Sequence, residues 1–409
     1  MDIRLIPKRE HIPCAFNIVE RKGVGHPDTL ADLIADQFAF NYTKYGLQSY
    51  GGFLNHNVDK VVLRGGVANI SFGNASVIKP IECILNGKIT SSIDDFTCDI
   101  SSLFNATVRY VFDEIFGSNT FFDNKIITFT ETNSGIGTEH DEGYYEPKCK
   151  QDLIQMGDEL TLTDTAVCAA FSSFTEAESL CIEVEKYINN SNFKQANPDT
   201  GHDVKVLVVE FESLYEITVC IPFIASLTHS YSLYRHRLHE VRTQLIDFIK
   251  SKSSKKFQLV LNSKDREGYG YLTVFGTALD KGDFGVVGRG NKQEGIISTL
   301  RPNIVEASSG KNLFRSTGKL GHTAATLMSQ QIYRELGIDS EVFVVSKNGK
   351  LLSESSVFIS LSSEHMKAKS NIEEIVMDIL GSHWKIVEYI LSRNPLVDKF
   401  DYCLRGEGK

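Results

Sequence analysis

The sequence ERKGVGHPD occupies residues 20–28 and runs directly into a helical pattern over residues 29–45. Pro27 suits the first turn of a helix, where its missing N–H costs nothing. The unpaired amides at a helix start attract phosphate oxygens, and His26 and Asp28 would lie beside them. Taken alone, the stretch also fits a plain turn, in which Asp28 only favours the helix dipole and His26 is a polar surface residue.

Size and composition narrow the class of protein. The chain has 409 residues, enough for two or three domains, and its 42% hydrophobic content can fill their cores. Its net charge is −9 and its lysines and arginines form no block. A general nucleic-acid surface needs clustered cations that release counterions, so we expect no nucleic-acid partner.

Cysteine usage and the N-terminus bear on the compartment. The eight cysteines are scattered, without a C-x-x-C pair or the histidine spacing of a zinc site, and they read as reduced, mostly buried thiols. The first nine residues carry charges where a signal peptide needs an apolar core, and no apolar run approaches the length of a membrane span. We expect a cytoplasmic protein that neither is secreted nor enters a membrane.

A strand-rich stretch and a second helix follow the first helix, which is expected to end at Gly46 as its C-cap. Asn86-Gly87 is a strong tight-turn signal, so strand 81–85 is expected to reverse there and meet Ile89. The other segments are read from their apolar spacing: strands 59–64 and 67–72, and a helix from Leu103 to Ile115 closed by Gly117.

This order of hairpin and helix returns twice, in units that start roughly 140 residues apart. The unit sequences are not visibly alike, so a triplication and three unrelated units both remain open. Either way, the pattern suggests three α/β layers. The second unit has strands 204–211 and 215–223 and a helix 230–250; the third has strands 341–346 and 357–361 about the turn Asn348-Gly349, and one final helix marked by apolar residues from Ile372 to Ile390. Between the units lie strand 125–130, a helix opened by the capping box Thr175 to Glu178, strands 257–262 and 271–275, and a helix 318–336.

A second informative stretch, GDFGVVGRGN, occupies residues 282–291 just after a predicted strand. Glycines let a backbone approach a ligand closely with its amides turned inward, and Arg289 offers a planar fork to phosphate oxygens. The stretch matches neither the P-loop nor the dinucleotide pattern. A long turn that needs positive φ angles explains it equally well when it is taken alone.

The third stretch, EASSGKN, occupies residues 306–312 and is followed by Arg315 and Lys319 at a helix start. Three cations in nine residues at the mouth of a helix could bind a polyphosphate. Lys311, which follows Ser-Gly, is the most specific candidate of the three. A solvated cationic surface is the alternative.

Together these stretches resemble the archaeal-type S-adenosylmethionine synthetases, or methionine adenosyltransferases. That family carries a near-identical ERKGxGHPD start, an Asn-x-Asp strand entry like residues 56–59, a GDxGxVGRGN loop, and an Arg-Pro…EASSGKN segment like residues 301–312. Four motifs in the family's order and spacing across nearly the whole chain are far more specific than any one of them.

The resemblance implies a fold and an assembly. We expect the α/β (α+β type) S-adenosylmethionine synthetase fold, with three interleaved α/β domains related by pseudo-threefold symmetry. Approximate boundaries are 1–125 for the first domain with the GHPD motif, 126–256 for the second, and 257–409 for the third with the glycine-rich and SGK loops. Similar proteins are homodimers with active sites shared between subunits, and they need Mg²⁺ and often K⁺.

The resemblance also implies that ATP and L-methionine are joined, with release of pyrophosphate and phosphate. The thioether sulfur has no proton to lose, so orientation and neutralisation of the triphosphate leaving group carry the chemistry. By resemblance, His26 stabilises the oxygen that leaves C5′, and Asp28 with Glu20 binds Mg²⁺. The remaining residues implied by the resemblance are Arg289, Lys311 and Arg315 for the phosphates, Asp283 for the methionine ammonium group, Asp164 near the nucleoside and amino acid, and Asp59, Ser309 and Gly310 as further substrate-binding residues.

Three segments depart from the family pattern. Residues 166–173 read AVCAAFSS where the family has a glycine-bearing segment, and both glycines have become alanine, which affects close backbone approach to the nucleoside. Residues 134–138 replace a Gly-Gln-Gly-Ser segment, and residues 201–205 read GHDVK in place of Gly-Glu-Asp before a lysine. The alternatives are therefore a divergent adenosyltransferase that uses another nucleotide or thioether, and a non-catalytic nucleotide-binding regulatory subunit.

Overall fold

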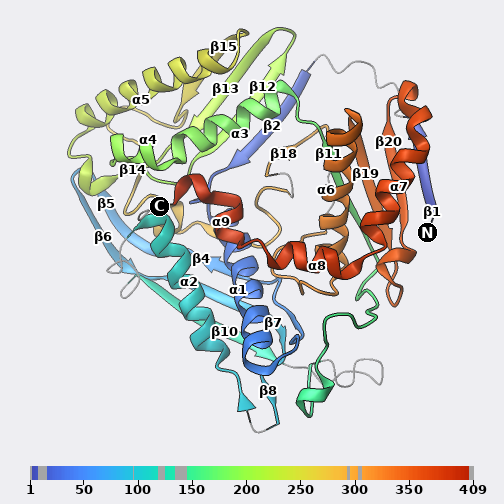
Figure 1. Ribbon diagram of the computed structural model, residues 1–409. Helices are drawn as coiled ribbons and strands as arrows, with labels where there is room; N and C mark the ends of the chain where they lie inside the picture. The colour runs from blue at the N-terminus through green and yellow to red at the C-terminus, as the bar shows by residue number, and fades with distance from the viewer. Residues whose placement is uncertain are drawn as a thin grey trace.

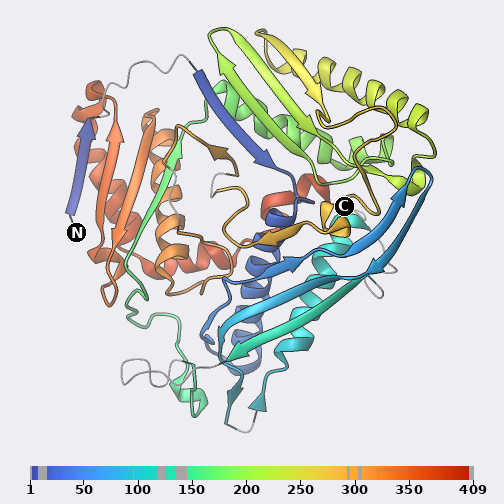
Figure 2. The same cartoon turned by 180° about the vertical axis from the view of Figure 1, so that it is seen from behind.

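The computed structural model describes residues 2–7, 16–94, 96–117, 125–133, 145–292, 295–302 and 306–404. Within these residues the strands form three sheets of four or five strands and three two-stranded pairs, and the helices gather on one side of the molecule (Figure 1). Seen from behind, the strands face the viewer (Figure 2). The expected mixed α/β architecture is confirmed, and each sheet has its own helices and its own buried core. The expected boundaries at residues 125 and 256 stay a prediction.

The first sheet carries the central helix α1, Pro27–Tyr50, and α2, Ile100–Phe116. Strand β7 pairs in parallel with β10 and antiparallel with β4 and β3, and β17 joins the edge from far along the chain. The strands, in spatial order, are β10 (Ile126–Asn133), β7 (Ile81–Ile89), β4 (Val62–Arg64) and β17 (Phe284–Val286), with β3 (His56–Asn57) also on β7.

The second sheet places β2, which carries the start of the ERKGVGHPD stretch, between two strands from later in the chain. Its strands, in spatial order, are β15 (Lys256–Leu261), β13 (Leu214–Cys220), β12 (Lys205–Phe211), β2 (Phe16–Lys22) and β18 (Ile297–Ser298). The helices that cover it are α3 (Glu176–Asn189), α4 (Ser191–Ala196) and α5 (Tyr231–Lys252).

The third sheet pairs the first strand of the chain with a late one, because β1 pairs in parallel with β20. Its strands, in spatial order, are β1 (Asp2–Pro7), β20 (Ser356–Leu361), β19 (Ser340–Ser346) and β11 (Ala166–Ser172). The helices α6 (Thr317–Leu336), α7 (Lys369–Leu380) and α8 (His383–Leu391) belong to this part, and a short helix α9 (Pro395–Phe400) follows. Three small pairs complete the strands: β14 (Phe223–Ile224) with β16 (Leu272–Thr273), β5 (Val67–Ser71) with β6 (Asn74–Lys79), and β8 (Ser92–Ile93) with β9 (Phe96–Thr97).

The expected C-cap at Gly46 is wrong. Helix α1 continues to Tyr50 and ends at Gly51, whose φ is +76° and whose N–H donates to the Leu47 carbonyl. Gly46 lies inside the helix, at a place where a Cβ would come within 2.9 Å of the Leu54 Cγ. Its small size lets the chain after the helix fold back against it.

The expected turn at Asn86-Gly87 is also wrong, since both residues lie inside the continuous strand β7. Their partners on β10 are Glu131 and Thr132. A Cβ on Gly87 would lie 2.2 Å from the Asn57 carbonyl, so the glycine serves the close approach of β3 rather than a reversal. The expected single final helix is broken as well, into α7 and α8 after Gly381.

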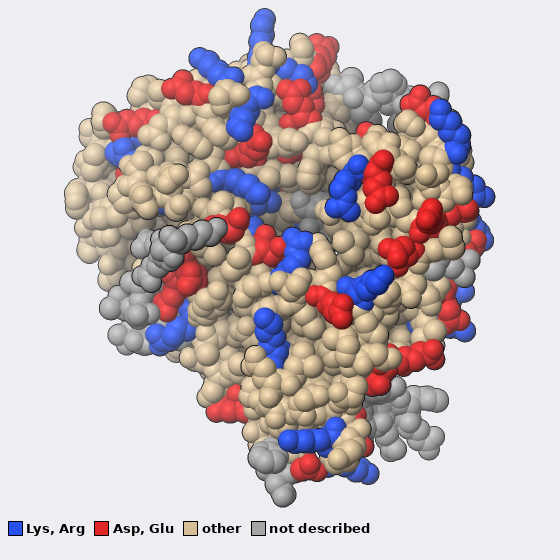
Figure 3. Space-filling model, in the orientation of Figure 1, with Lys and Arg blue, Asp and Glu red and all other residues tan. Residues whose placement is uncertain are grey.

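The expected capping box of α3 and the expected free thiols of the described cysteines are confirmed. The Thr175 side chain accepts the Glu178 N–H at 3.2 Å and the Glu178 carboxylate accepts the Thr175 N–H at 2.8 Å, which completes the capping box of α3. The described cysteines are free, and five are buried: Cys83, Cys98, Cys168, Cys181 and Cys403. Among the described residues, none of the helices has the length and apolarity that crossing a bilayer requires. Lysines and arginines lie interspersed with acids over the face seen in Figure 3.

Candidate active site

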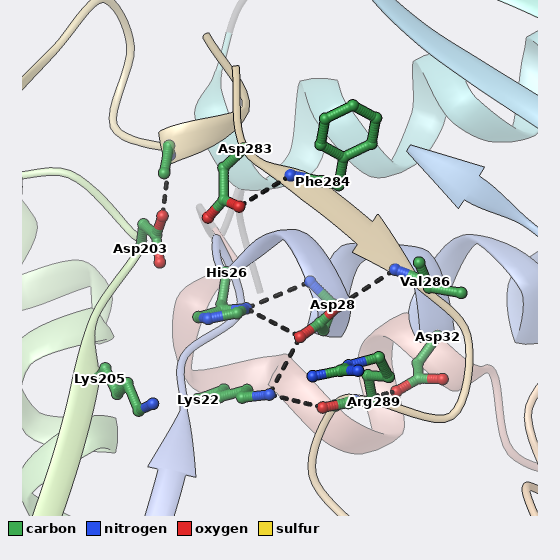
Figure 4. Close-up of polar contacts among 12 residues, drawn as sticks. Lys22, His26, Asp28, Asp32, Asp203, Lys205, Asp283, Phe284, Val286 and Arg289 are labelled. Atoms are coloured by element: carbon green, nitrogen blue, oxygen red, sulfur yellow. Dashed lines mark hydrogen bonds and ion pairs between the residues drawn. The ribbon is translucent and has the colours of Figure 1, made fainter. Parts of the chain in front are cut away.

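His26 is the N-cap of α1, and its side chain accepts a hydrogen bond rather than donating one at this position. The Asp28 N–H donates to the His26 Nδ1 at 3.2 Å. The ring proton therefore sits on Nε2, which points away from Asp28 (Figure 4). Burial, assisted by the neighbouring Lys22, lowers the pKa of His26 to about 4. At neutral pH the residue is a neutral imidazole with one directed N–H donor.

Asp28 is buried and both of its oxygens have partners. Oδ1 accepts the Val286 N–H at 3.1 Å, and Oδ2 lies 3.0 Å from the Lys22 Nζ. The same ammonium donates to the Arg289 carbonyl at 2.6 Å (Figure 4). Asp28 and Lys22 together tie the glycine-rich loop to the mouth of the helix.

The glycine-rich loop is held along α1 by acids at four-residue spacing, which the sequence interpretation missed. Asp32 accepts the Gly288 N–H at 2.7 Å and the Gly290 N–H at 3.1 Å, one helical turn after Asp28. Burial raises the pKa of Asp32 to about 6. The loop amides were expected to face a ligand, but these face the helix acids, because the loop lies directly on α1. A Cβ on Gly290 would come within 2.2 Å of the Asp32 Oδ2.

A cavity of about 440 Å³ brings His26 and Asp283 together with Asp203 and Lys205. Asp283 is exposed and its Oδ1 accepts the N–H of Phe284 at 2.9 Å. Burial raises the pKa of Asp203 to about 7, although its Oδ2 accepts the Ala278 N–H at 2.8 Å. Residues 203 and 205 belong to a departing segment of the sequence, and the structure brings that segment to the same cavity as His26.

Lys205 was not predicted as a site residue, and it pairs with a predicted one. Its Nζ lies 3.0 Å from the Glu20 Oε2, on the neighbouring strand. Lys205 and Lys22 both lower the pKa of His26, after burial. The helix mouth therefore combines cations with the carboxylates of Glu20, Asp28 and Asp283.

A second cavity of about 750 Å³ contains Lys311, Arg315 and Asp164. The Lys311 Nζ lies 2.5 Å from the Glu306 Oε1 and 3.6 Å from the Asp59 Oδ2. Burial opposes ionisation, but Glu306 raises the pKa of Lys311 above its ordinary value. Asp164 is fixed at the start of α6, because its N–H and carbonyl both bond to the Thr317 hydroxyl at 3.0 and 2.9 Å. This cavity therefore combines the cations Lys311 and Arg315 with the carboxylate of Asp164.

His56 lines the second cavity and was missed as a candidate. Its Nδ1 lies 3.1 Å from the Leu54 carbonyl, so Nδ1 donates and Nε2 is left as an acceptor. Among the described residues the Nε2 has no hydrogen-bond partner. Burial lowers the pKa of His56 to about 4, which keeps that acceptor neutral. The histidine before Asn57 in the sequence motif was the available signal.

Ser309 and Gly310 face the middle of α1. The Gly310 N–H donates to the Asp36 Oδ1 at 3.0 Å, and the Ser309 hydroxyl lies 3.4 Å from the Asp36 Oδ2. Gly310 has a φ of +71°, and a Cβ there would lie 2.5 Å from the Val58 carbonyl. Asp28, Asp32 and Asp36 form one row on α1, which we call the acid row. Asp28 and Asp32 accept N–H groups of the glycine-rich loop, and Asp36 accepts one from the Lys311 loop.

The predicted site residues therefore form two groups in one chain. The first lies at the helix mouth and contains Glu20, His26, Asp28, Asp283 and Arg289. The second lies at the larger cavity and contains Asp59, Asp164, Lys311 and Arg315. Asp32 and Asp36 are four residues apart on α1, so the two loops meet the helix about 6 Å from each other.

The departures from the family pattern are in part structural. Residues 166–172 form β11, which pairs antiparallel with β19. Ala170 is buried in the third core, and the Ala169 carbonyl lies 3.3 Å from the His322 Nδ1. These alanines serve the sheet and its packing on α6. Residues 134–138 lie outside the described residues, as do residues 303–305 of the fourth motif.

Known proteins resemble this chain over nearly its whole length. A model of the family described as S-adenosylmethionine synthetase (AdoMet synthetase) matches residues 4–394. The S-adenosylmethionine synthase of Pyrobaculum calidifontis is 33% identical over 360 residues, which are 86% of this chain and 88% of that protein. That of Pyrobaculum neutrophilum is 31% identical over 401 residues, or 95% of this chain and 98% of that protein.

A solved structure also resembles the fold. It is described as an unusual S-adenosylmethionine synthetase from Campylobacter jejuni, and it covers 95% of this chain with a TM-score of 0.54 and 15% identity. At that identity the likeness concerns the fold alone.

Proposed function

This chain belongs to the S-adenosylmethionine synthetase family, and we propose that it is a methionine adenosyltransferase that forms S-adenosylmethionine from ATP and L-methionine. In this reaction a sulfur lone pair of methionine attacks C5′ of ATP, and the S–C5′ bond forms as the C5′–O bond breaks. Triphosphate leaves and is hydrolysed by water to pyrophosphate and phosphate. The chemistry calls for orientation of two substrates and for neutralisation of a highly charged leaving group.

The observation that carries this proposal is the directed N–H of His26 at the mouth of α1. Since Nδ1 accepts the Asp28 N–H, the Nε2–H can donate to the bridging oxygen as negative charge develops on it. A pKa of about 4 keeps the imidazole neutral in the free protein, so it acts as a hydrogen-bond donor there. Lys22 and Lys205 lie beside it and add positive charge.

The triphosphate would be held by cations from both groups of residues. Arg289 has an exposed side chain on the glycine-rich loop, and its position is fixed by the Lys22 bond to its carbonyl. Lys311 and Arg315 line the second cavity. Each of them offers donors that phosphate oxygens accept strongly.

We propose that Mg²⁺ binds at the helix mouth and takes most of its ligands from phosphate, since the described residues contain no group of three or more His, Cys, Asp or Glu that could hold a metal ion. Mg²⁺ is bound by one or two carboxylates together with substrate phosphate oxygens, and Glu20 and Asp28 supply such hard oxygen donors. Each carboxylate is paired with a lysine in the free protein, Glu20 with Lys205 and Asp28 with Lys22. When bound, the ion would neutralise charge on the leaving triphosphate. Family members often use K⁺ as well.

Asp283 would pair with the ammonium group of methionine, since its exposed carboxylate lines the same cavity as His26. Asp164 would contact the nucleoside and amino acid from the second cavity, where Asp59 orients Lys311. Ser309 and Gly310 would fix the backbone that precedes Lys311, through their bonds to Asp36.

We also propose a homodimer in which each active site takes one group of residues from each subunit. In support, His26 and Asp283 of the first group line one cavity of the chain, and the second cavity is lined by Asp164, Lys311 and Arg315. The first sheet also exposes large apolar side chains, including Phe284 at 55%, Ile127 at 44% and Phe129 at 43%. Such a surface is typical of one covered by a partner. Light scattering on the eluting protein would measure the mass, and a monomer would contradict the shared site.

The test of the reaction uses purified protein with ATP, methionine, Mg²⁺ and K⁺. S-adenosylmethionine, pyrophosphate and phosphate are followed together by mass spectrometry, and we expect all three in equal amounts. Nucleotide binding without any product would refute the proposal and favour a regulatory subunit. Product with a different nucleotide or thioether alone would instead identify a divergent adenosyltransferase.

A further inference from the structure

The chain continues past the family match, which ends at residue 394, into a segment that packs on α1. We call residues 394–403 the C-terminal strap; it consists of α9 and a short helical turn at Asp401–Cys403. Asn394 caps α9 by accepting the N–H groups of Leu396 and Val397. Leu396 and Phe400 are buried in the first core with α1, and Figure 1 shows α9 beside α1. The strap is therefore a packed element of the fold.

One ion pair connects the strap to the loop that precedes Lys311. The Lys399 Nζ lies 2.8 Å from the Asp36 Oδ2, and Lys319 of α6 lies 2.8 Å from the Oδ1. Asp36 is 3% exposed and also accepts the Gly310 N–H. Although burial opposes ionisation, the two lysines hold the pKa of Asp36 well below its ordinary value. A single carboxylate thus joins α1, α6, the strap and the loop.

Asp36 is held by two cations at once. Two ammonium groups share its carboxylate, and the carboxylate of Asp32, one turn earlier on α1, also attracts both lysines. If Lys399 were removed, Asp36 would keep only Lys319, and the loop that donates the Gly310 N–H to Asp36 would lose one of its restraints.

A second contact connects the strap to the ERKGVGHPD stretch. The Tyr402 hydroxyl donates to the Glu185 Oε2 at 2.8 Å and accepts from the Arg21 Nη2 at 3.1 Å. Arg21 also pairs with Glu185 at 2.6 Å, and its Nη1 donates to the Gly295 carbonyl. The strap thus also contacts Arg21 of the ERKGVGHPD stretch, and Arg21 in turn bonds to the segment that follows the glycine-rich loop.

We propose that the C-terminal strap positions the Lys311 loop for binding the triphosphate of ATP, and that Lys399 is the positioning residue, acting through Asp36. This inference rests on the proposed function, because it assigns the loop to phosphate. Lys399 has its role without touching the substrate. A strap that only stabilised the fold would affect the melting temperature and leave the affinity for triphosphate unchanged.

The test compares Lys399→Met with Lys399→Arg and with Lys385→Met. Lys385 is the matched control, because its side chain is 69% exposed and its Nζ lies 3.6 Å from Asp378, far from either loop in sequence. The dissociation constant for inorganic tripolyphosphate is measured by titration calorimetry on the full chain. The KM values for ATP and methionine and the kcat are measured alongside it.

We expect Lys399→Met to weaken tripolyphosphate binding and to raise the KM for ATP roughly tenfold, with the KM for methionine unchanged. Lys399→Arg should restore most of the affinity, and Lys385→Met should match the wild type. Unchanged tripolyphosphate affinity in Lys399→Met, with or without a lower melting temperature, would overturn the proposal. If that variant does not fold, Lys399→Gln replaces it, with the same expected weakening of tripolyphosphate binding, and unchanged affinity in that variant would overturn the proposal.

The experiments distinguish a wrong role for the strap from a wrong assignment of the reaction. A wild-type protein that binds tripolyphosphate but forms no S-adenosylmethionine refutes the proposed function, and the affinity of Lys399→Met then still decides the role of the strap. A wild-type protein without affinity for tripolyphosphate refutes both.

Discussion

Replacement of His26 tests the donor that the proposed reaction needs, but the residue has two roles that must be separated. Its Nδ1 caps α1 by accepting the Asp28 N–H at 3.2 Å, and its Nε2–H is the proposed donor to the leaving oxygen. His26→Ala removes both. His26→Ser removes the donor and keeps a capping oxygen, because serine is among the best N-cap residues and its side chain is too short to reach the position of Nε2.

The two roles have different expected magnitudes. Loss of a donor aimed at a developing oxyanion costs about 3 kcal/mol in the transition state, or on the order of 100-fold or more in kcat. Loss of an N-cap costs about 1 kcal/mol of stability. We therefore expect both variants to release triphosphate on the order of 100-fold more slowly, while His26→Ala alone unfolds at lower denaturant concentration.

The assay measures triphosphate formed in a single turnover by rapid quench, with ATP affinity from calorimetry. Affinity should stay within about threefold of the wild type, because the donor acts mainly in the transition state. A wild-type rate in His26→Ser with a slow His26→Ala would refute the reasoning, since the cap would then explain the whole effect. A wild-type rate in both would remove His26 from the chemistry.

Three further changes test other parts of the structure. Asp283→Asn should raise the KM for methionine at least about tenfold and leave the KM for ATP unchanged, because an ammonium group would lose its charged partner; a normal methionine dependence would remove Asp283 from the site. Gly290→Ala would place a Cβ 2.2 Å from the Asp32 Oδ2 and should lower kcat/KM, and an unchanged value would show that the loop tolerates the shift. Burial raises the pKa of Asp280 to about 7, above its ordinary value of 3.8, so the folded state holds a proton that the unfolded state has lost. The stability contributed by this group is present below pH 3.8 and is lost as the pH rises through about 7. In urea unfolding, Asp280→Asn should therefore be more stable than the wild type at pH 8 but not at pH 4. An equal difference in stability at both pH values would contradict the raised pKa of Asp280.

Elements that depend on neighbouring residues could be predicted from the sequence. Pro27 and His26 mark the start of α1, and the capping box at Thr175 marks that of α3, because the groups involved lie within three residues of each other. The hairpin about Asn348-Gly349 is likewise present, with β19 and β20 antiparallel. The Asn86-Gly87 turn failed because pairing of β7 with β10 outweighs a local preference.

The sequence by itself determined the family, the position of α1 and the kinds of side chain available for chemistry, because motifs and capping signals act through residues close together in the chain. The tertiary structure alone decided what those side chains do. The spacing of Asp28, Asp32 and Asp36 is visible in the sequence, but the amides they accept come from residues more than 250 positions away. Packing of the three sheets decides which polar atoms bond within the protein and which remain for a substrate. Only in the packed structure do distant donors and acceptors come within hydrogen-bonding distance.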